Sequence, residues 1–292
     1  MKHAQRAIGV ILSLAMLASV PAGYGWAAAF DEDREIGVVS REDGSGTRGA
    51  FIELFGIEVR NPDGTRKDMT TKEAVIANQT NVMMTNIAGN RYGIGYISLG
   101  SLNRTVKALD IGGVKATVEN VKNRSYPVAR PFNIATKGEP KGLTKDFIGF
   151  ILSREGQAVV VSQGYIAIDD DAPAYSGGKP AGKITVGGSS SVTPVMERLK
   201  EAYIALNPAA AVEIQQSDSS AGLKDAVNGI CDIAMASREL RESELERLTP
   251  IRIALDGIAV IVNNQNPVTN LTQEQVKAIF TGETTRWNGV SR

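Results

Sequence analysis

The sequence contains one histidine, His3, and one cysteine, Cys231, among 292 residues. His3 lies in an N-terminal segment that we expect to be removed, so the rest of the chain holds no imidazole. A Ser/His/Asp or Cys/His nucleophilic site is therefore excluded, as is a zinc site built on histidine or paired cysteines. A disulfide within the chain is excluded too, because it needs two cysteines.

An excess of charge of one sign is also missing. Lys plus Arg and Asp plus Glu each number 32, so the formal net charge is zero. Such a chain has no broad attraction for nucleic acid or for an acidic membrane surface, and we expect neither as a partner. The 42% of hydrophobic and 22% of charged residues are typical of a globular protein.

The first 29 residues have the composition of an export signal. Lys2 and Arg6 precede an uncharged apolar run over residues 7–20, and the small residues Ala27, Ala28 and Ala29 follow. This pattern predicts a secretory signal peptide over residues 1–29, and export to the periplasm or the outer cell surface. The alternative is an uncleaved anchor, although the run is short for a spanning helix of about 20 residues. No cysteine follows the run, so we expect no lipid attachment at a mature N-terminal cysteine.

From residue 35 onward, short apolar strand candidates alternate with amphipathic helix candidates, which predicts an α/β fold with largely parallel sheets. Strands are expected over residues 36–40, 93–98, 126–136, 183–186, 211–215, 231–234 and 258–262. Helices are expected over residues 47–55, 81–88, 193–206, 221–228 and 271–280, and residues 143–163 are expected to form two helices separated near Ser153. Two loop-like runs rich in Asp, Pro and Gly, over residues 169–173 and 176–180, separate two such series, so two α/β lobes are predicted.

Three loops each lie between a predicted strand and a predicted helix: Arg41–Thr47, Gly187–Ser191 and Ser217–Gly222. A helix N-terminus presents unpaired N–H groups and a partial positive charge, and small residues let an anion approach them. Any one loop is more often a simple helix cap, but three in one chain favour one shared anionic ligand. None fits the Gly-x-x-x-x-Gly-Lys-Ser/Thr pattern, which argues against a kinase or ATPase.

Arg41 is the one cation within these loops. A guanidinium makes paired hydrogen bonds to two oxygens of a tetrahedral oxyanion, so Arg41 is a candidate ligand-binding residue. We expect Asp43, two residues on, to orient it. The alternative is an exposed Arg–Asp pair that contributes at most ~1 kcal/mol.

Several segments, among them VVSREDGSGTRGAF, VGGSSSVTPVMERLKEAY, QQSDSSAGLKDAV and EQVKAIFTGETTRW, closely resemble the phosphate-binding protein of bacterial phosphate ABC transporters. The resemblance covers nearly all of residues 35–292. It implies a two-lobed periplasmic-binding-protein fold of type II, with inorganic phosphate trapped between the lobes and passed to the transporter's permease subunits. It implies neither a catalytic activity nor a cofactor or metal.

The resemblance also implies a set of phosphate-binding residues, namely Arg41, Ser45, Gly46, Thr47, Ser190, Ser191 and Ser219, with Asp43 holding Arg41. Many members of the family carry an aspartate that accepts the proton of phosphate where this chain has Ser237. Ser237 and Asp256 are therefore further candidates for the site, with Asp256 as the substitute acceptor and Asp218 as the second choice. A turn residue is the alternative reading of Asp256.

The order of the segments departs from the family, because the Arg-Glu-Asp-Gly-Ser-Gly-Thr loop here precedes the Gly-Gly-Ser-Ser-Ser loop. We interpret this as a circular permutation, with the old ends joined across Ser176–Gly182. One lobe would comprise residues 127–265 and the other residues 30–126 plus 266–292, with Tyr126–Pro131 and Asn263–Gln265 crossing between them. The rival interpretation is a piece of a tandem binding protein with weakened binding.

Other functions remain open from the sequence. The binder could take another oxyanion such as sulfate, or the protein could process phosphate esters, which the lack of histidine and of clustered metal-binding carboxylates disfavours. We expect a closed monomer, with a dimer formed by exchange of halves as the alternative.

Overall fold

The computed structural model describes residues 29–61 and 66–290. All but the last residue of the predicted signal peptide, including His3, lies outside the described residues. Within them, no helix is both long and apolar enough to cross a membrane.

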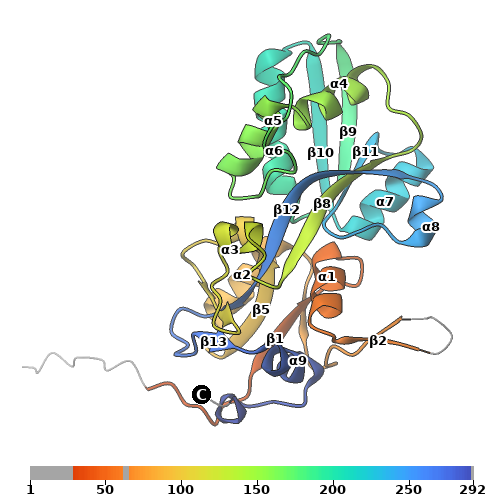
Figure 1. Cartoon of the computed structure of the whole chain (residues 1–292). Coiled ribbons are helices and arrows are strands. Elements are labelled where there is room, and N and C mark those ends of the chain that lie inside the picture. The colour runs from red at the N-terminus through yellow and green to blue at the C-terminus, as the bar shows by residue number, and fades with distance from the viewer. Residues whose placement is uncertain (1–28, 62–65, 291–292) are drawn as a thin grey trace, which may run out of the picture.

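The chain forms two lobes, and the strands β8 (Ala129–Thr136) and β12 (Thr249–Val262) run from one to the other (Figure 1). The first lobe contains β1 (Gly37–Arg41), α1 (Gly46–Leu54), β2 (Glu58–Arg60), β3 (Arg66–Asp68), β4 (Val75–Ala77), α2 (Thr80–Gly89), β5 (Gly93–Ser98), the 3-10 turn Leu99–Ser101, β6 (Lys107–Ala108), β7 (Asp110–Ile111), α3 (Val118–Lys122), β13 (Asn270–Leu271), α9 (Gln273–Thr281) and the 3-10 turn Trp287–Gly289. The second lobe contains α4 (Gly142–Ile151), α5 (Arg154–Ser162), β9 (Gly182–Ser189), α6 (Thr193–Leu206), β10 (Ala210–Ser217), α7 (Ser219–Asn228), β11 (Ile233–Ala236) and α8 (Glu242–Leu245).

One mixed sheet extends through both lobes. Within the described residues nine strands form it, in the order β10-β9-β11-β8-β12-β5-β1-β4 with β6 beside β12. Pairing is parallel at both ends of this order, but β12 is antiparallel to both β8 and β5. The expectation of largely parallel sheets therefore fails at the centre, because β8 leads the chain into the second lobe and β12 leads it back.

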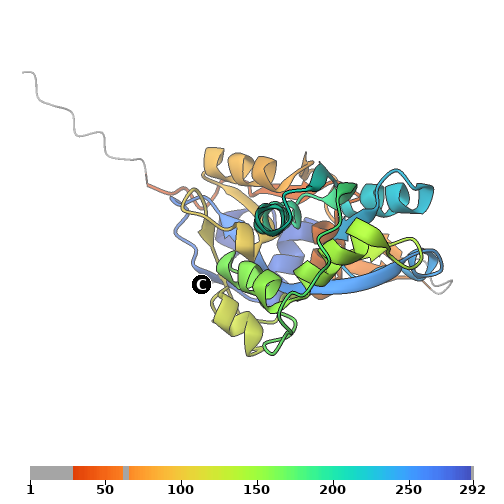
Figure 2. The same ribbon diagram turned by 90° about the horizontal axis from the view of Figure 1, so that it is seen from above.

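Helices cover both faces of the first-lobe strands. Val121 of α3 packs with Ile258 and Val260 of β12, whereas Met83 of α2 packs with the alternate residue Ala259. Since successive side chains of a strand point to opposite faces, α2 and α3 lie on opposite sides of the sheet, as the view from above shows (Figure 2).

Separate hydrophobic cores define the two lobes. In the first, Phe51 of α1 stacks on Tyr96 of β5 with their ring centroids 3.8 Å apart. In the second, Phe147 of α4 packs against Tyr203 of α6. Residues 258–262 of β12 belong to the cores of the first lobe. The chain therefore returns to the first lobe by residue 258, earlier than the expected residue 266. The crossing segments are thus β8 and β12, and Asn263–Gln265 lies beyond the crossing, where Asn263 donates to carbonyls of α2.

The predicted elements agree with the structure where hydrophobic periodicity is strong. The predicted helix over residues 193–206 coincides with α6, and Ser153 caps α5 between two helices as expected. Thr272 caps α9, and its capping box with Gln275 supplies partners for the first helical N–H groups. The hairpin β2–β3 and the first half of β12 were not predicted, because their exposed or mixed residues show no clear alternation.

The core of the second lobe allows a stability prediction. We expect Phe147→Ala to lower the free energy of unfolding by about 3–5 kcal/mol, because it leaves a cavity beside Tyr203. Val161 on α5 is 55% exposed, so Val161→Ala should change the free energy of unfolding by no more than about 0.5 kcal/mol. Urea unfolding followed by circular dichroism measures both, and equal effects would contradict this assignment of the core.

Candidate functional site

Hydroxyl groups from both lobes meet at the N-terminal ends of several helices. Thr47 lies in the first turn of α1 and Thr80 begins α2, both in the first lobe; Ser190 and Ser191 precede α6 in the second. The Oγ1 atom of Thr47 lies 2.7 Å from Ser191 Oγ, and Thr80 Oγ1 lies 3.4 and 3.3 Å from the hydroxyls of Ser190 and Ser191. All four side chains are buried. We call the polar groups that meet at this junction the cradle; its residues are Arg41, Gly46, Thr47, Thr80, Ser189, Ser190, Ser191, Ser219 and Ser237.

The second lobe supplies three further serines to the cradle. Ser189 ends β9, Ser219 begins α7, and Ser237 follows β11. Ser189 Oγ donates to Ser237 Oγ at 3.0 Å, and the Ser237 N–H donates to Ser219 Oγ at 3.2 Å. Gly46 faces them from the first lobe so closely that an added Cβ would lie 2.7 Å from Ser237 Oγ and nearer still to Ser219 Oγ. The lobes are therefore in contact through the predicted loops.

Arg41 brings a positive charge into the cradle from the end of β1. Its guanidinium is buried, and Nη2 donates to Ser190 Oγ of the other lobe at 3.0 Å. Nε donates to the carbonyl of Ala77, and the Arg41 N–H donates to the Tyr96 hydroxyl at 3.1 Å. Burial raises the pKa of Tyr96 to about 12, so this phenol stays neutral. Contacts with Ser190, Ala77 and Tyr96 thus fix the end of β1 and the side chain of Arg41.

The carboxylate that pairs with Arg41 is Glu42, which corrects the prediction of Asp43. Glu42 accepts from Nε at 2.8 Å and from Nη2 at 2.7 Å, a two-point contact. Asp43 is 96% exposed and pairs with Arg48, whose guanidinium also donates to the Arg41 carbonyl at 2.6 Å. The strand β1 ends at Arg41 and the chain turns at residues 43–44, which leaves Glu42 against the guanidinium of Arg41 and brings Asp43 to Arg48.

Asp256 is also paired with an arginine, so it is not a free carboxylate at the cradle. Its Oδ2 atom accepts from Nε and Nη2 of Arg130 at 3.1 and 3.0 Å, and Gly100 N–H donates to Oδ1 at 3.4 Å. Burial raises the pKa of this carboxyl, and the charge of Arg130 opposes that rise. The expectation of a proton acceptor for phosphate at Asp256 is thus corrected to a partner of Arg130. Asp218, the second choice, caps α7 by accepting from the Ala221 N–H at 2.8 Å.

The remaining predicted residues lie at the same junction. Ser45 caps α1 by accepting from the Arg48 N–H at 3.3 Å. Sequence reasoning missed Thr80, Glu42, Ser189 and Arg130. Thr80 could have been found as a threonine at the start of a predicted helix, and Glu42 and Ser189 adjoin predicted residues. Arg130 has no such signal, because only the pairing of β8 with β12 brings it to Asp256.

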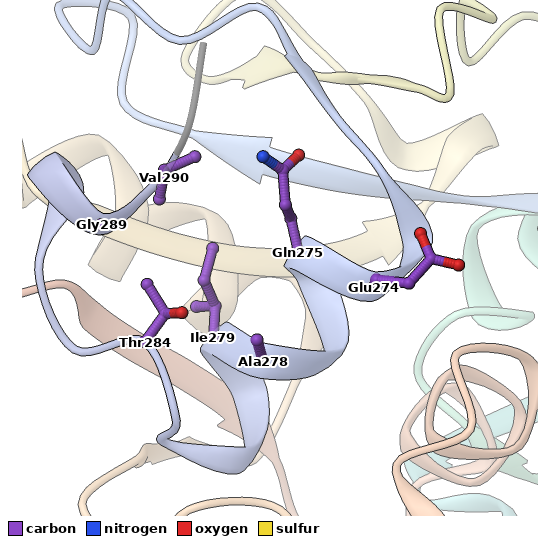
Figure 3. Close-up of a pocket in the computed structure, with 7 residues that line it drawn as sticks. All are labelled: Glu274, Gln275, Ala278, Ile279, Thr284, Gly289 and Val290. Carbon is purple, nitrogen blue, oxygen red and sulfur yellow. The ribbon is translucent and has the colours of Figure 1, made fainter.

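Two surface hollows lie away from the cradle. One of about 220 Å³ is on the outer face of α9, where Glu274, Ile279 and Val290 are among its lining residues (Figure 3). Another of about 520 Å³ lies between α4 and the segment that contains Tyr175. No predicted site residue lines either hollow. The cradle is defined by its converging polar groups, which are separate from both hollows.

Comparisons with known proteins show the family of the chain. The family model of the PBP superfamily domain matches residues 12–155 and 173–290. A phosphate-binding protein PstS 2 from Streptococcus agalactiae is 54% identical over 259 residues, covering 88% of each chain. A protein of the same name from Streptococcus pneumoniae is 44% identical over 256 residues, covering 87% of each. The chain belongs to the PBP superfamily, in the family of the phosphate-binding proteins.

A solved structure supports the same family assignment. The phosphate-binding protein of a phosphate ABC transporter from Streptococcus pneumoniae TIGR4 superposes with a TM-score of 0.71 at 43% identity, covering 88% of this chain and 100% of that chain. The resemblance and the α/β periplasmic-binding-protein fold predicted from the sequence are therefore confirmed. The permuted order of segments stays a prediction.

The close approach of Gly46 to the second lobe can be tested without a ligand. We expect Gly46→Ala to lower the melting temperature, because its methyl group would collide with Ser219 and Ser237 and push the lobes apart. Gly49→Ala, in the same helix, meets its nearest neighbour at 3.5 Å and should raise helix stability by about 0.5–1 kcal/mol. Calorimetric melting compares them, and a stabilised Gly46→Ala variant would contradict the closed contact.

Proposed function

We propose that this protein binds inorganic phosphate between its lobes, outside the cytoplasm, and delivers it to the permease of an ABC transporter. The observation that carries the proposal is the buried Arg41 guanidinium, which donates to the hydroxyl of Ser190 in the opposite lobe and to that of Thr80 in its own lobe, at converging helix N-termini. Hydroxyl and N–H donors around a guanidinium match a tetrahedral oxyanion. The names of the relatives point to the same ligand.

The binding mechanism that we propose is capture by closure. Each lobe holds part of the donor set, Arg41 and Thr47 on one side and Ser190, Ser191 and Ser219 on the other. A phosphate that bridges them would favour the closed arrangement and be shielded from water. Each charge-assisted hydrogen bond contributes about 1.5–3 kcal/mol, so a few of them offset the cost of dehydration and leave micromolar affinity, about −8 kcal/mol.

We also propose that the site only binds and releases its ligand, as a monomer. The cradle consists of hydroxyls, main-chain N–H groups and arginine, and the only histidine of the sequence is His3. Export follows from the predicted signal peptide. The PstS 2 relatives, which align over 87–88% of each chain, share the order of segments of this chain, whereas the match to Bacillus subtilis PstS covers 50% of this chain and 46% of that protein.

A second ligand, sulfate, is favoured by the pairing of carboxylates around the cradle. Glu42 pairs with Arg41, and Asp256 pairs with Arg130. Glu244 pairs with Arg238, the residue after Ser237, while Asp218 caps α7. A free carboxylate would accept the proton of phosphate and repel sulfate, whereas carboxylates held by arginines or by a helix cap give little of that discrimination.

The central residue of the proposal is tested by calorimetry with inorganic phosphate. We expect a single site in the exported chain, and a loss of affinity of about 100-fold or more in Arg41→Ala, which removes a guanidinium able to make two charge-assisted hydrogen bonds. Arg198→Ala, on the outer face of α6 and 57% exposed, is the matched control and should bind as the parent does. Parental binding by Arg41→Ala would remove Arg41 from the site.

Selectivity is tested by titrating phosphate into protein saturated with sulfate at pH 6 and pH 8. We expect sulfate to compete with an affinity within about tenfold of that for phosphate, because its fully deprotonated oxygens meet no free carboxylate. Asp218→Asn should leave the ratio unchanged. If sulfate fails to compete in the parent but competes in Asp218→Asn, Asp218 is the proton acceptor and the cradle is selective for phosphate.

A further inference from the structure

Arg130 and Asp256 form an ion pair at the point where the chain crosses between the lobes. They lie directly opposite each other on the antiparallel strands β8 and β12. Both side chains are 1% exposed. The binding mechanism described above uses neither of them, although they are the most deeply buried of the salt-bridged pairs in the part of the chain that the structure describes.

The pair is connected to both lobes. Arg130 Nη1 donates to the main-chain carbonyl of Ser237 at 3.1 Å, and Ser237 belongs to the cradle through its hydroxyl and its N–H. On the other side, Gly100 of the first lobe donates to Asp256 Oδ1. A full positive charge therefore lies one hydrogen bond away from a cradle residue.

Stability alone is a weak explanation for such a pair. Removing two charges from water is costly, and replacing a buried ion pair by apolar residues of similar volume is often neutral or stabilising. A charge in this position does act on its surroundings, because interactions between charges are stronger at a given distance in a poorly solvated interior than in water. Burial lowers the pKa of Arg130, Asp256 opposes this, and Arg41 lowers it further, so the two guanidinium groups interact with each other.

We propose that Arg130 is a second cationic determinant of ligand affinity, a positioning residue that acts on the bound anion through Ser237, and that Asp256 attenuates its charge. The inference rests on the proposed binding of phosphate and identifies a residue pair that controls its strength. Arg41 would contact the anion, whereas Arg130 holds the Ser237 segment and adds positive potential behind it. Asp256 keeps that potential low enough for the anion to be released.

Opposite changes of affinity in two variants test the inference. Asp256→Asn removes the negative charge and leaves Arg130 uncompensated, so we expect phosphate affinity to rise by about tenfold. Arg130→Gln leaves the negative charge of Asp256 uncompensated, so affinity should fall by about tenfold or more. A merely structural pair would lower affinity in both variants, because each weakens the contact between Arg130 and Asp256. Calorimetry with inorganic phosphate at two salt concentrations gives the readout.

A second comparison separates charge from fold. Arg130→Lys keeps the charge but loses the two-point contact with Asp256, and should bind phosphate within about threefold of the parent. A loss in Arg130→Lys as large as in Arg130→Gln would overturn the inference, whether or not Asp256→Asn folds. Glu213→Gln, which breaks the exposed pair with Lys183, is the control for a distant charge and should change nothing. Absence of phosphate binding by the parent would instead overturn the proposed function.

Discussion

The structure depends on keeping a buried guanidinium charged at the junction of two lobes. Arg41 is 2% exposed, and an unpaired charge in that position would be strongly destabilising. Glu42 neutralises it from the adjacent position on the chain, while the hydroxyl of Ser190 approaches from the other lobe. The first turns of α1, α2 and α7 bring further N–H dipoles to the same region. Any arrangement of the lobes that keeps Arg41 buried must therefore supply polar groups from both sides.

The same principle recurs at each arginine near the cradle. Arg130 is paired with Asp256 inside the crossing strands, and Arg238 is paired with Glu244 from α8. These pairs leave the cradle and its surroundings close to electrically neutral, although three arginines lie there. An incoming anion then meets preorganised donors without a large excess of positive charge, an arrangement that suits reversible binding better than permanent retention.

The crossing strands connect the cradle with the hydrophobic cores of both lobes. β8 and β12 contribute to the cores of both lobes, and they also carry Arg130 and Asp256. Ser237 links this pair to the second-lobe part of the cradle, and Gly100 links it to the first lobe. The strands therefore connect the two lobes covalently, and the charges of Arg130 and Asp256 on them lie between the two lobes. A loop connection of the same length would lack the ladder of hydrogen bonds that fixes the pair in register.

Local pattern alone determined the α/β class, most helices and the three small-residue loops, because helix caps and hydrophobic periodicity are set by neighbouring residues. It also pointed to Arg41, and the resemblance added Ser190 and Ser219 within these loops; the structure brings all three side chains to one junction. The resemblance of those loops to a known family supplied the expected ligand. Only the tertiary structure decided that Glu42 and not Asp43 faces Arg41, that Asp256 pairs with Arg130, and that β12 changes lobes along its length. The pairing of Asp256 with Arg130 depends on strand direction and register, which bring together residues more than 100 positions apart and leave no mark in the local sequence. The contact of Glu42 with Arg41 depends on where β1 ends and the chain turns.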